Sequence, residues 1–392
     1  MGKLIMLKLR GKVQAYNKTW YGPRLLTVTS NPDLPRVLRK KYVLIQDNEL
    51  ISVPGFAAII LRNQKDEIFD SIIDAENIYI VGEDYDYVGE GDIVRLNPTT
   101  DYISSLFRRK SNHNTVLLTE RCNNYCLMCS QPPKNADDTW LIEEAFELIN
   151  LVPNQTQRLG FSGGEPTLYG MRFVELIQHA KNYLPSTSLD VLSNGRAFKD
   201  DGFAQALGNV AHQDLMIGIP VYSDDPVLHD YIVQAKGAFD ETIQGILNLK
   251  RFGQKVEIRI VIHKETLPRL VQTCEFIARN LLFVDHVALM GLEITGFTRA
   301  NLGLLWADPF EYKDILSEAV NVLTSYGLNT SVYNHQLCTV NADVLPAYRQ
   351  SISDWKNEYI DKCDSCTRKS ECGGFFSSAV QYRYSDFITP FN

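Results

Sequence analysis

Two patterns of hydrophobic and polar positions divide the chain. Up to about residue 108, short or alternating apolar runs are separated by turn residues such as Asn31-Pro32-Asp33 and Gly89-Glu90-Gly91-Asp92. Runs bounded in this way are typical of strands, so we expect a strand-rich barrel or sandwich. The expected strands cover a first strand within residues 1–7, then 25–28, 42–45, 57–61, 78–81 and 92–96.

From residue 115, runs of strand length alternate with helical periodicity. This alternation predicts parallel strands with crossover helices. We therefore expect an α/β fold, a partial (β/α)6 TIM-type barrel whose site lies on the loops after the strands. The expected strands are 116–119, 158–161, 188–192, 215–221, 256–262 and 286–290, with 328–333 as a last strand, and the expected helices are 138–151, 172–183, 241–252, 268–282 and 309–326.

Three domains follow: a strand-rich part over 1–108, the barrel over 109–335 and a cysteine-bearing segment over 336–392. Residues 107–112 are basic and polar and read as a short linker. The first domain carries no motif with chemistry. It is either a structural or lid domain, or a docking surface for a peptide that adds a strand at an edge.

Composition narrows the class of protein. The 392 residues are 45% hydrophobic and 22% charged, as in a globular protein, and the net charge of −8 disfavours a broad nucleic-acid surface. No apolar run approaches the ~20 residues of a membrane span. The apolar start is interrupted by Lys8 and Arg10 and reads as a strand, not a signal peptide. We expect a cytoplasmic protein, in which reduced thiols favour metal ligation over disulfides.

Three cysteines crowd the loop after the first barrel strand. Cys122, Cys126 and Cys129 form a C-x3-C-x2-C array. Thiolates hold iron–sulfur clusters, and three of them leave one metal position open, as a catalytic site needs. A zinc knuckle is the alternative, although zinc sites usually show paired C-x2-C spacing with a second pair or histidines. The next strand ends in Gly163-Gly164-Glu165-Pro166.

With this triplet and G-G-E-P, the chain resembles the radical S-adenosylmethionine (radical SAM) enzymes over roughly residues 115–334. The resemblance implies that the three cysteines hold a 4Fe–4S cluster with an open iron site, which SAM chelates. It implies that Gly163, Gly164, Glu165 and Pro166 bind the SAM amino group. An electron from a donor such as flavodoxin or ferredoxin would then cleave SAM to a 5′-deoxyadenosyl radical, which takes hydrogen from a substrate.

Further SAM contacts are expected at the later strand ends. The resemblance places ribose contacts at Ser193 and Asn194, and Ser223 ends the fourth strand. Arg259 alternates with apolar residues and faces into the barrel, where it meets the SAM carboxylate or a structural partner, Glu257 or Glu293. Met128, between the last two cysteines, is expected to pack on adenine.

Four more cysteines lie near the C-terminus, and Cys274 alone reads as a buried apolar residue. Four thiolates fit a second, fully ligated 4Fe–4S cluster or a structural zinc. Their spacing resembles the auxiliary-cluster segments of radical SAM peptide maturases, the SPASM and twitch types. Phe376 stands where SPASM domains carry a further cysteine, so one cluster is expected. Its ligands would be Cys338, Cys363, Cys366 and Cys372.

The whole chain resembles the His-Xaa-Ser system radical SAM maturases, through segments such as residues 333–338 and 372–376. The resemblance implies a peptide or small protein substrate, such as a partner with His-Xaa-Ser repeats. His335 and Trp355 then line the substrate site or belong to the core. Two other functions stay open: a radical SAM enzyme acting on a nucleotide or small metabolite, and a non-catalytic iron–sulfur carrier.

Overall fold

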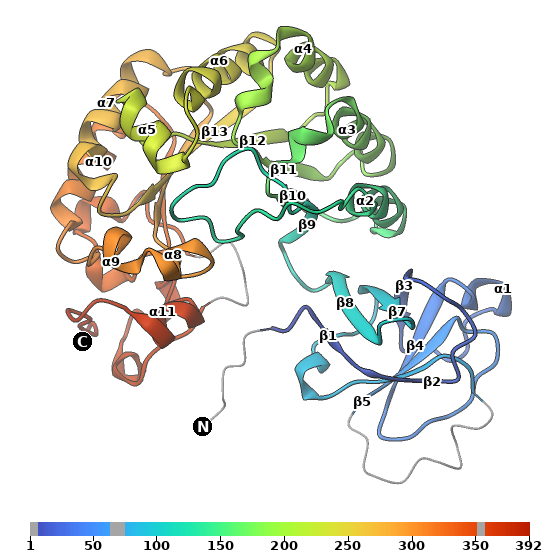
Figure 1. Ribbon diagram of the computed structural model, residues 1–392. Helices are drawn as coiled ribbons and strands as arrows, with labels where there is room; N and C mark the ends of the chain where they lie inside the picture. The colour runs from blue at the N-terminus through green and yellow to red at the C-terminus, as the bar shows by residue number, and fades with distance from the viewer. Residues whose placement is uncertain (1–6, 63–74, 351–356) are drawn as a thin grey trace. The chain divides into compact units, whose positions relative to one another are not determined.

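The computed structural model describes residues 7–62, 75–350 and 357–392, and its chain forms two compact units (Figure 1). One unit comprises Met1–Asn114 with Phe146–Asn154, and the other comprises Thr115–Ala145 with Gln155–Asn392. The strand expected within residues 1–7 lies outside the described residues, apart from Leu7, which is not in a strand.

The first unit is built on an eight-stranded mixed sheet with the order β1-β8-β7-β3-β4-β5-β6-β2. Strands β3 to β6 pair in parallel, and the remaining pairs are antiparallel. All five strands expected between residues 25 and 96 are present. The strands are β1 (Arg10–Lys12), β2 (Gln14–Tyr16), β3 (Arg24–Thr29), β4 (Tyr42–Asp47), β5 (Ala58–Arg62), β6 (Ile78–Ile80), β7 (Ile93–Asn97) and β8 (Tyr102–Phe107), with a short helix α1 (Arg36–Arg39).

The two ends of this sheet are joined by one continuous segment. β1 pairs with β8 and β2 pairs with β6, and only Val13 separates β1 from β2. The Val13 N–H donates to the Asp101 carbonyl oxygen at 2.9 Å. The order of strands therefore closes on itself as a barrel around an apolar core that includes Val28, Ile60 and Val94.

The second unit contains a seven-stranded sheet whose spatial order, β15-β14-β13-β12-β11-β10-β9, follows the sequence. The pairs from β10 to β15 are parallel. β15 is the last strand expected over residues 328–333. The strands are β9 (Asn114–Thr119), β10 (Arg158–Gly163), β11 (Ser188–Leu192), β12 (Leu215–Pro220), β13 (Lys255–Ile262), β14 (His286–Gly291) and β15 (Thr330–Tyr333).

Helices cover the outer side of these strands, as in a partial barrel (Figure 1). The five expected helices are present. The helices α4 and α5 were not expected, because two glycines weaken the periodicity of α4 and because α5 is short. The helices are α2 (Trp140–Leu151), α3 (Met171–Tyr183), α4 (Asp201–Val210), α5 (Pro226–Val233), α6 (Ala238–Arg251), α7 (Leu270–Asn280), α8 (Phe297–Ala300), α9 (Leu302–Leu305), α10 (Lys313–Ser325) and α11 (Ser377–Tyr382).

The alternation along β13 decides which side chains face the inside of the barrel. Val256, Ile258, Ile260 and Ile262 are buried, while Glu257, Arg259 and Val261 on the opposite face are only partly buried. Because successive side chains of a strand point to opposite faces, Arg259 lies on the inner face, as expected.

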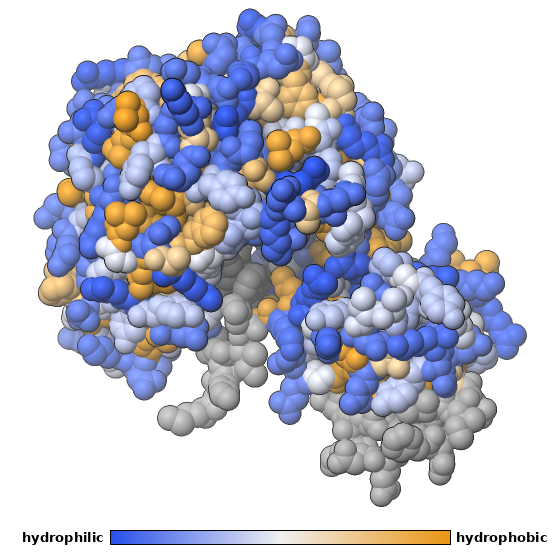
Figure 2. Space-filling view, in the orientation of Figure 1, coloured by the Kyte–Doolittle hydropathy of each residue, from blue (hydrophilic) through white to orange (hydrophobic). Residues whose placement is uncertain are grey.

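The visible surface is mostly hydrophilic, with separate hydrophobic patches (Figure 2). Among the described residues, no helix combines the length and hydropathy that crossing a membrane requires.

Candidate functional site

The loop between β9 and α2 carries the first three cysteines, and both sides of it are anchored. The N–H groups of Tyr125 and Leu127 donate to carbonyl oxygens at the end of α5, at 3.0 and 2.9 Å. At the start of α8, the Phe297 N–H donates to the Cys129 carbonyl oxygen at 2.8 Å, and the Thr298 hydroxyl donates to the Met128 carbonyl oxygen at 3.1 Å. Cys122, Cys126 and Cys129 are therefore fixed at the end of the barrel where the strands finish.

Gly163, which ends β10, and Gly164 bring the G-G-E-P turn against this loop. The Gly164 N–H donates to the Thr119 carbonyl oxygen at 2.7 Å, and the Glu165 N–H donates to the Arg121 carbonyl oxygen at 2.8 Å. A Cβ at Gly163 would lie 2.3 Å from Thr119 O, and one at Gly164 would lie 2.0 Å from Arg121 O. The absence of a side chain at both positions therefore lets this turn approach the backbone at the end of β9 and in the cysteine loop.

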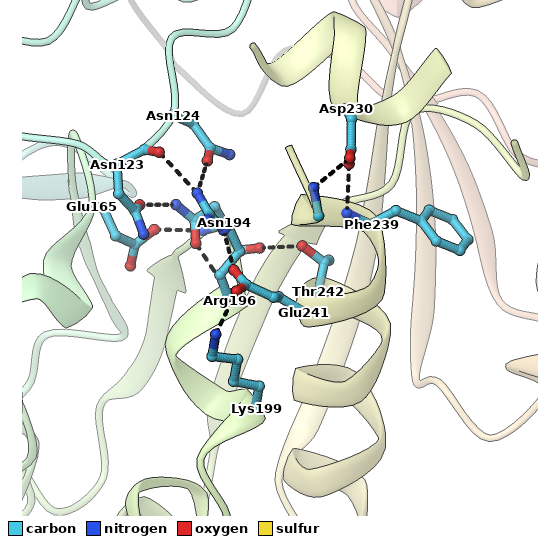
Figure 3. A network of polar contacts seen from close by, with 12 residues as sticks. Asn123, Asn124, Glu165, Asn194, Arg196, Lys199, Asp230, Phe239, Glu241 and Thr242 are labelled. Atoms are coloured by element: carbon cyan, nitrogen blue, oxygen red, sulfur yellow. Dashed lines mark hydrogen bonds and ion pairs between the residues drawn. The ribbon is translucent and has the colours of Figure 1, made fainter. Parts of the chain in front are cut away.

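The Glu165 carboxylate is buried and connects the ends of two strands (Figure 3). It accepts hydrogen bonds from the Thr167 hydroxyl at 2.6 Å, the Ser193 hydroxyl at 2.8 Å and the Asn194 N–H at 2.6 Å. Burial raises the pKa of Glu165, and these donors oppose the rise. Three predicted site residues, Glu165, Ser193 and Asn194, thus lie in one network, and Pro166 begins the following 3-10 turn Pro166–Tyr169.

Arg196 was not predicted, and it ties the same network to the cysteine loop (Figure 3). Its guanidinium donates to the Asn123 carbonyl oxygen at 2.8 Å and to Asn124 Oδ1 at 2.6 Å. It also pairs with Glu241 of α6 at 2.7 Å. The spacing of residues in the sequence gives no sign of this contact, because the partners are far apart along the chain.

Asp138 holds the base of the loop and was also not predicted. Its buried carboxylate accepts from the Glu120 N–H at 2.5 Å, the Thr119 hydroxyl at 2.9 Å and the Arg121 guanidinium at 3.0 Å. Burial opposes ionisation, but these donors and the Arg121 charge lower the pKa of Asp138 below its usual value. The start and the end of the cysteine loop are therefore joined at one ionised carboxylate.

The surroundings of the three thiols disfavour their negatively charged form unless a positively charged group is bound to them. Burial, with like charge from the neighbouring cysteines, raises the pKa of Cys122 to about 11 and of Cys126 to about 12, and burial raises that of Cys129. In the described part of the chain, no three His, Cys, Asp or Glu side chains converge closely enough to hold a metal ion. The donor set itself fits an iron–sulfur cluster, since bound metal removes the protons of coordinating thiols.

Ser223 lies in the loop that follows β12, and Arg259 lies within β13. The Ser223 hydroxyl is buried and accepts from the Asp225 N–H at 3.0 Å. Arg259 Nε lies 3.6 Å from Glu257 Oε1, so the structural partner weighed for Arg259 is present. Glu257 also contacts His286 Nδ1 at 2.6 Å, and the His286 contact and the Arg259 charge lower the pKa of Glu257 against the effect of burial.

Met128 packs in an apolar cluster with Tyr222, Ile232 and Leu305 and is 7% exposed. This packing fixes the cysteine loop in the core, and the contact of Met128 with adenine stays a prediction. His335 is fully buried and shares a 2.8 Å hydrogen bond with the Tyr312 hydroxyl, which makes it a core residue. Trp355 lies outside the described residues.

The four C-terminal cysteines, Cys338, Cys363, Cys366 and Cys372, line one pocket. Three backbone N–H groups point at their sulfurs: Leu337 to Cys372 at 3.3 Å, Gly374 to Cys372 at 3.4 Å and Phe391 to Cys366 at 3.4 Å. Iron–sulfur clusters are held by four thiolates, and hydrogen bonds to sulfur tune them, so this pocket fits such a cluster. Residues 388–391 also line this pocket, which the spacing of the cysteines does not indicate.

Comparisons with known proteins find similarity in the part of the chain that carries Cys122, Cys126 and Cys129. Residues 116–277 match the family profile described as the radical SAM superfamily. A curated relative, GTP 3′,8-cyclase from Nautilia profundicola, is 27% identical over 164 residues, which are 40% of this chain and 49% of the relative. The chain thus spans about half the length of this relative.

Two solved structures resemble part of the chain. Streptococcus suis SuiB bound to S-adenosylmethionine is 16% identical with a TM-score of 0.45, over 56% of this chain and 50% of that one. The enzyme anSMEcpe with bound AdoMet and the Kp18Cys peptide is 13% identical with a TM-score of 0.48, over 71% and 91%. The family match and the site geometry coincide on the cysteine loop and its supports, and residues 116–277 are therefore the part of the chain that resembles the radical SAM superfamily.

Proposed function

We propose that this protein reductively cleaves SAM to a 5′-deoxyadenosyl radical and uses it to abstract hydrogen from a peptide or small protein, as a step of post-translational modification. The observation that carries the proposal is the direct contact between the two motifs of the radical SAM domain. The N–H groups of Gly164 and Glu165 donate to carbonyl oxygens of the loop that bears Cys122, Cys126 and Cys129. These three cysteines would hold a 4Fe–4S cluster with an open iron site.

The proposed SAM site follows the ends of β10 to β13. Glu165, Ser193 and Asn194 already form a hydrogen-bonded network, and Ser223 lies in the loop that follows β12. Arg259 is proposed for the SAM carboxylate because its ion pair with Glu257, at 3.6 Å, is longer than a charge-assisted hydrogen bond. The tasks of these residues are to orient SAM and to exclude water from the site.

A second 4Fe–4S cluster, held by Cys338, Cys363, Cys366 and Cys372, is the feature that favours a peptide substrate. The position of all four cysteines in the lining of one pocket supports it, together with the resemblance of their spacing to auxiliary-cluster segments of peptide maturases. A small partner with His-Xaa-Ser repeats is the proposed type of substrate. A flavodoxin or ferredoxin is the proposed type of electron donor.

The curated relative favours a second candidate, a radical SAM enzyme that acts on a nucleotide. That match covers 40% of this chain, which is about the length of the radical SAM match over residues 116–277. Consumption of GTP by the reconstituted protein in the presence of SAM and a reductant would favour this candidate. Unchanged GTP, with 5′-deoxyadenosine formed, would leave the peptide proposal in place.

The test begins with iron and sulfide per chain after anaerobic reconstitution. We expect about eight iron in the wild type and about four in a Cys122/Cys126/Cys129→Ala triple variant, because each cysteine set would hold one cluster of four. About four iron falling to near zero would mean that the C-terminal cysteines bind zinc or no metal.

Release of 5′-deoxyadenosine from SAM under strong reduction is the second measurement. Cys122→Ala should abolish it and leave the circular dichroism spectrum unchanged. Cys274→Ala is the matched control, since Cys274 is buried in α7, away from both cysteine sets. Retained cleavage in Cys122→Ala would contradict the assigned site, and no cleavage by the wild type would favour a non-catalytic carrier.

A further inference from the structure

A second pocket lies where β14 and β15 end, next to the C-terminal cysteines. Gly291 and Asn334, which end or follow these strands, line it, and so do Trp306, Tyr312, Phe375 and Arg383. Gln336 and Phe375 line both this pocket and the cysteine pocket. In barrels of parallel strands, ligands bind at the ends where the strands finish, so the pocket is placed for a substrate.

Arg383 is the charged side chain of this pocket, and its guanidinium lies over the Trp306 ring at 3.8 Å from the centroid. The side chain is exposed. Within residues 7–62, 75–350 and 357–392, no ion pair or hydrogen bond of this guanidinium is found. The guanidinium is therefore available to a carboxylate of a ligand.

This arrangement is suited to a carboxylate. A guanidinium offers a planar set of donors that matches the two oxygens of a carboxylate. Stacking on Trp306 holds the plane of the guanidinium, so less side-chain freedom is lost on binding. The aromatic walls, Trp306 and Phe375, can take the apolar part of a peptide beside that contact.

We propose that this pocket binds the substrate peptide through the side-chain carboxylate of an aspartate or glutamate, held by Arg383. The inference rests on the proposed peptide-modifying function and adds to it a requirement for an acidic residue in the substrate. Bound there, the acidic residue lies against the backbone of Gly373 and Gly374, directly after Cys372.

The experiment measures how fast phenylglyoxal, an arginine reagent, modifies Arg383 in the reconstituted full chain, followed by mass spectrometry. Three blocked peptides are added at one millimolar concentration: acetyl-Gly-Glu-Gly-amide, acetyl-Gly-Gln-Gly-amide, and acetyl-Gly-Gln-Gly with a free C-terminus. We expect only the glutamate peptide to slow the modification of Arg383, several-fold. Equal rates with all three would overturn the proposal, and protection by the free C-terminus alone would overturn the side-chain assignment.

Arg299 is the matched control within the same sample. It is also exposed and lies over an aromatic ring, Tyr382, at 4.9 Å, but it does not line the pocket. Its modification should be unaffected by every peptide. If Arg299 were protected by the glutamate peptide as strongly as Arg383, the contact would be non-specific charge attraction and the proposal would fail.

Variants separate this inference from the proposed function. In a fluorescence titration, Arg383→Gln should lose the preference for the glutamate peptide over the glutamine peptide, about tenfold for one charged hydrogen-bonded pair. Arg383→Lys should recover only part of it, since lysine lacks the planar donors. Release of 5′-deoxyadenosine without peptide should be equal in the wild type, Arg383→Gln and Arg299→Gln. A wild type that fails to cleave SAM sinks the proposed function, whereas normal cleavage without a glutamate preference sinks this inference alone.

Discussion

The Arg196 guanidinium donates a hydrogen bond of 2.6 Å to Oδ1 of Asn124, a residue 72 positions earlier in the chain. Asn124 lies between Cys122 and Cys126, so an arginine that follows β11 fixes the conformation of the cysteine loop. The same guanidinium is paired with Glu241 of α6. Three elements of the barrel are therefore coupled at the place where the first cluster is proposed.

Replacement of Arg196 should loosen this loop. Arg196→Met removes two hydrogen bonds to the loop and leaves Glu241 with Lys199 as its remaining partner. We expect a loss of about 2 kcal/mol in the free energy of unfolding and lower iron content after reconstitution. Urea denaturation and iron analysis measure the two effects. Lys199→Met is the control, because Lys199 binds the same Glu241 and makes no contact with the loop (Figure 3); equal effects of both variants would contradict the role of Arg196.

Gly164→Ala should separate the G-G-E-P turn from the cysteine loop. The added methyl group would lie 2.0 Å from the Arg121 carbonyl oxygen, so the backbone of one segment must move. We expect a destabilisation of about 1–3 kcal/mol and loss of SAM cleavage. Gly303→Ala in α9 is the matched change, since no atom lies within 4 Å of its added Cβ. Thermal denaturation and 5′-deoxyadenosine release test the pair, and normal cleavage by Gly164→Ala would refute the close approach.

The carboxylate of Asp138 should make the stability of the loop depend on pH. Its pKa is lower in the folded protein than in the unfolded chain, so its contribution is present above the unfolded value of about 3.9 and is lost as the pH falls through the folded value. Asp138→Asn should therefore lower the urea midpoint at pH 7, and the deficit should shrink as the pH falls below the unfolded value of about 3.9. Glu147→Gln, an exposed position of α2, should leave the midpoint unchanged throughout. A deficit of Asp138→Asn that does not shrink as the pH falls would disprove this account.

The C-terminal tail should protect the second cysteine set. Phe391 donates its N–H to Cys366 Sγ, and Ile388 and Pro390 line the pocket. Deletion of residues 388–392 should lower the iron content from about eight toward about four per chain, because the proposed second cluster becomes open to solvent. Val380→Ala in α11, outside the pocket, should keep the full content. Full iron content after the deletion would show that the tail has no protective role.

Much of the barrel could be predicted because its strands follow simple rules. The alternation of Val256, Ile258 and Ile260 with polar residues placed Arg259 on the inner face, and the structure confirms this orientation. The two cysteine sets and G-G-E-P could be read directly, since each follows a predicted strand or forms a compact spacing.

The supports of the site could not be predicted, because they depend on contacts between distant segments. The hydrogen bond from the Asn194 N–H to the Glu165 carboxylate joins the ends of two strands, and its partners are 29 residues apart in the sequence. The contact of Glu257 with His286 depends on the register of β13 with β14. Met128 shows the same limit: its position between cysteines gives no sign that α5 and α9 pack around it.

The segment Arg10–Tyr16 has a consequence for the solubility of the first unit. It covers an edge of β8 with β1 and an edge of β6 with β2, and Val13 is the only residue between the two pairings. A protease cut or truncation that removes this segment would uncover unpaired N–H and carbonyl groups on two strands at once, and such edges pair readily with other chains. These seven residues therefore protect the unit against edge-to-edge aggregation, and a chain that starts after Tyr16 should self-associate through β6 and β8.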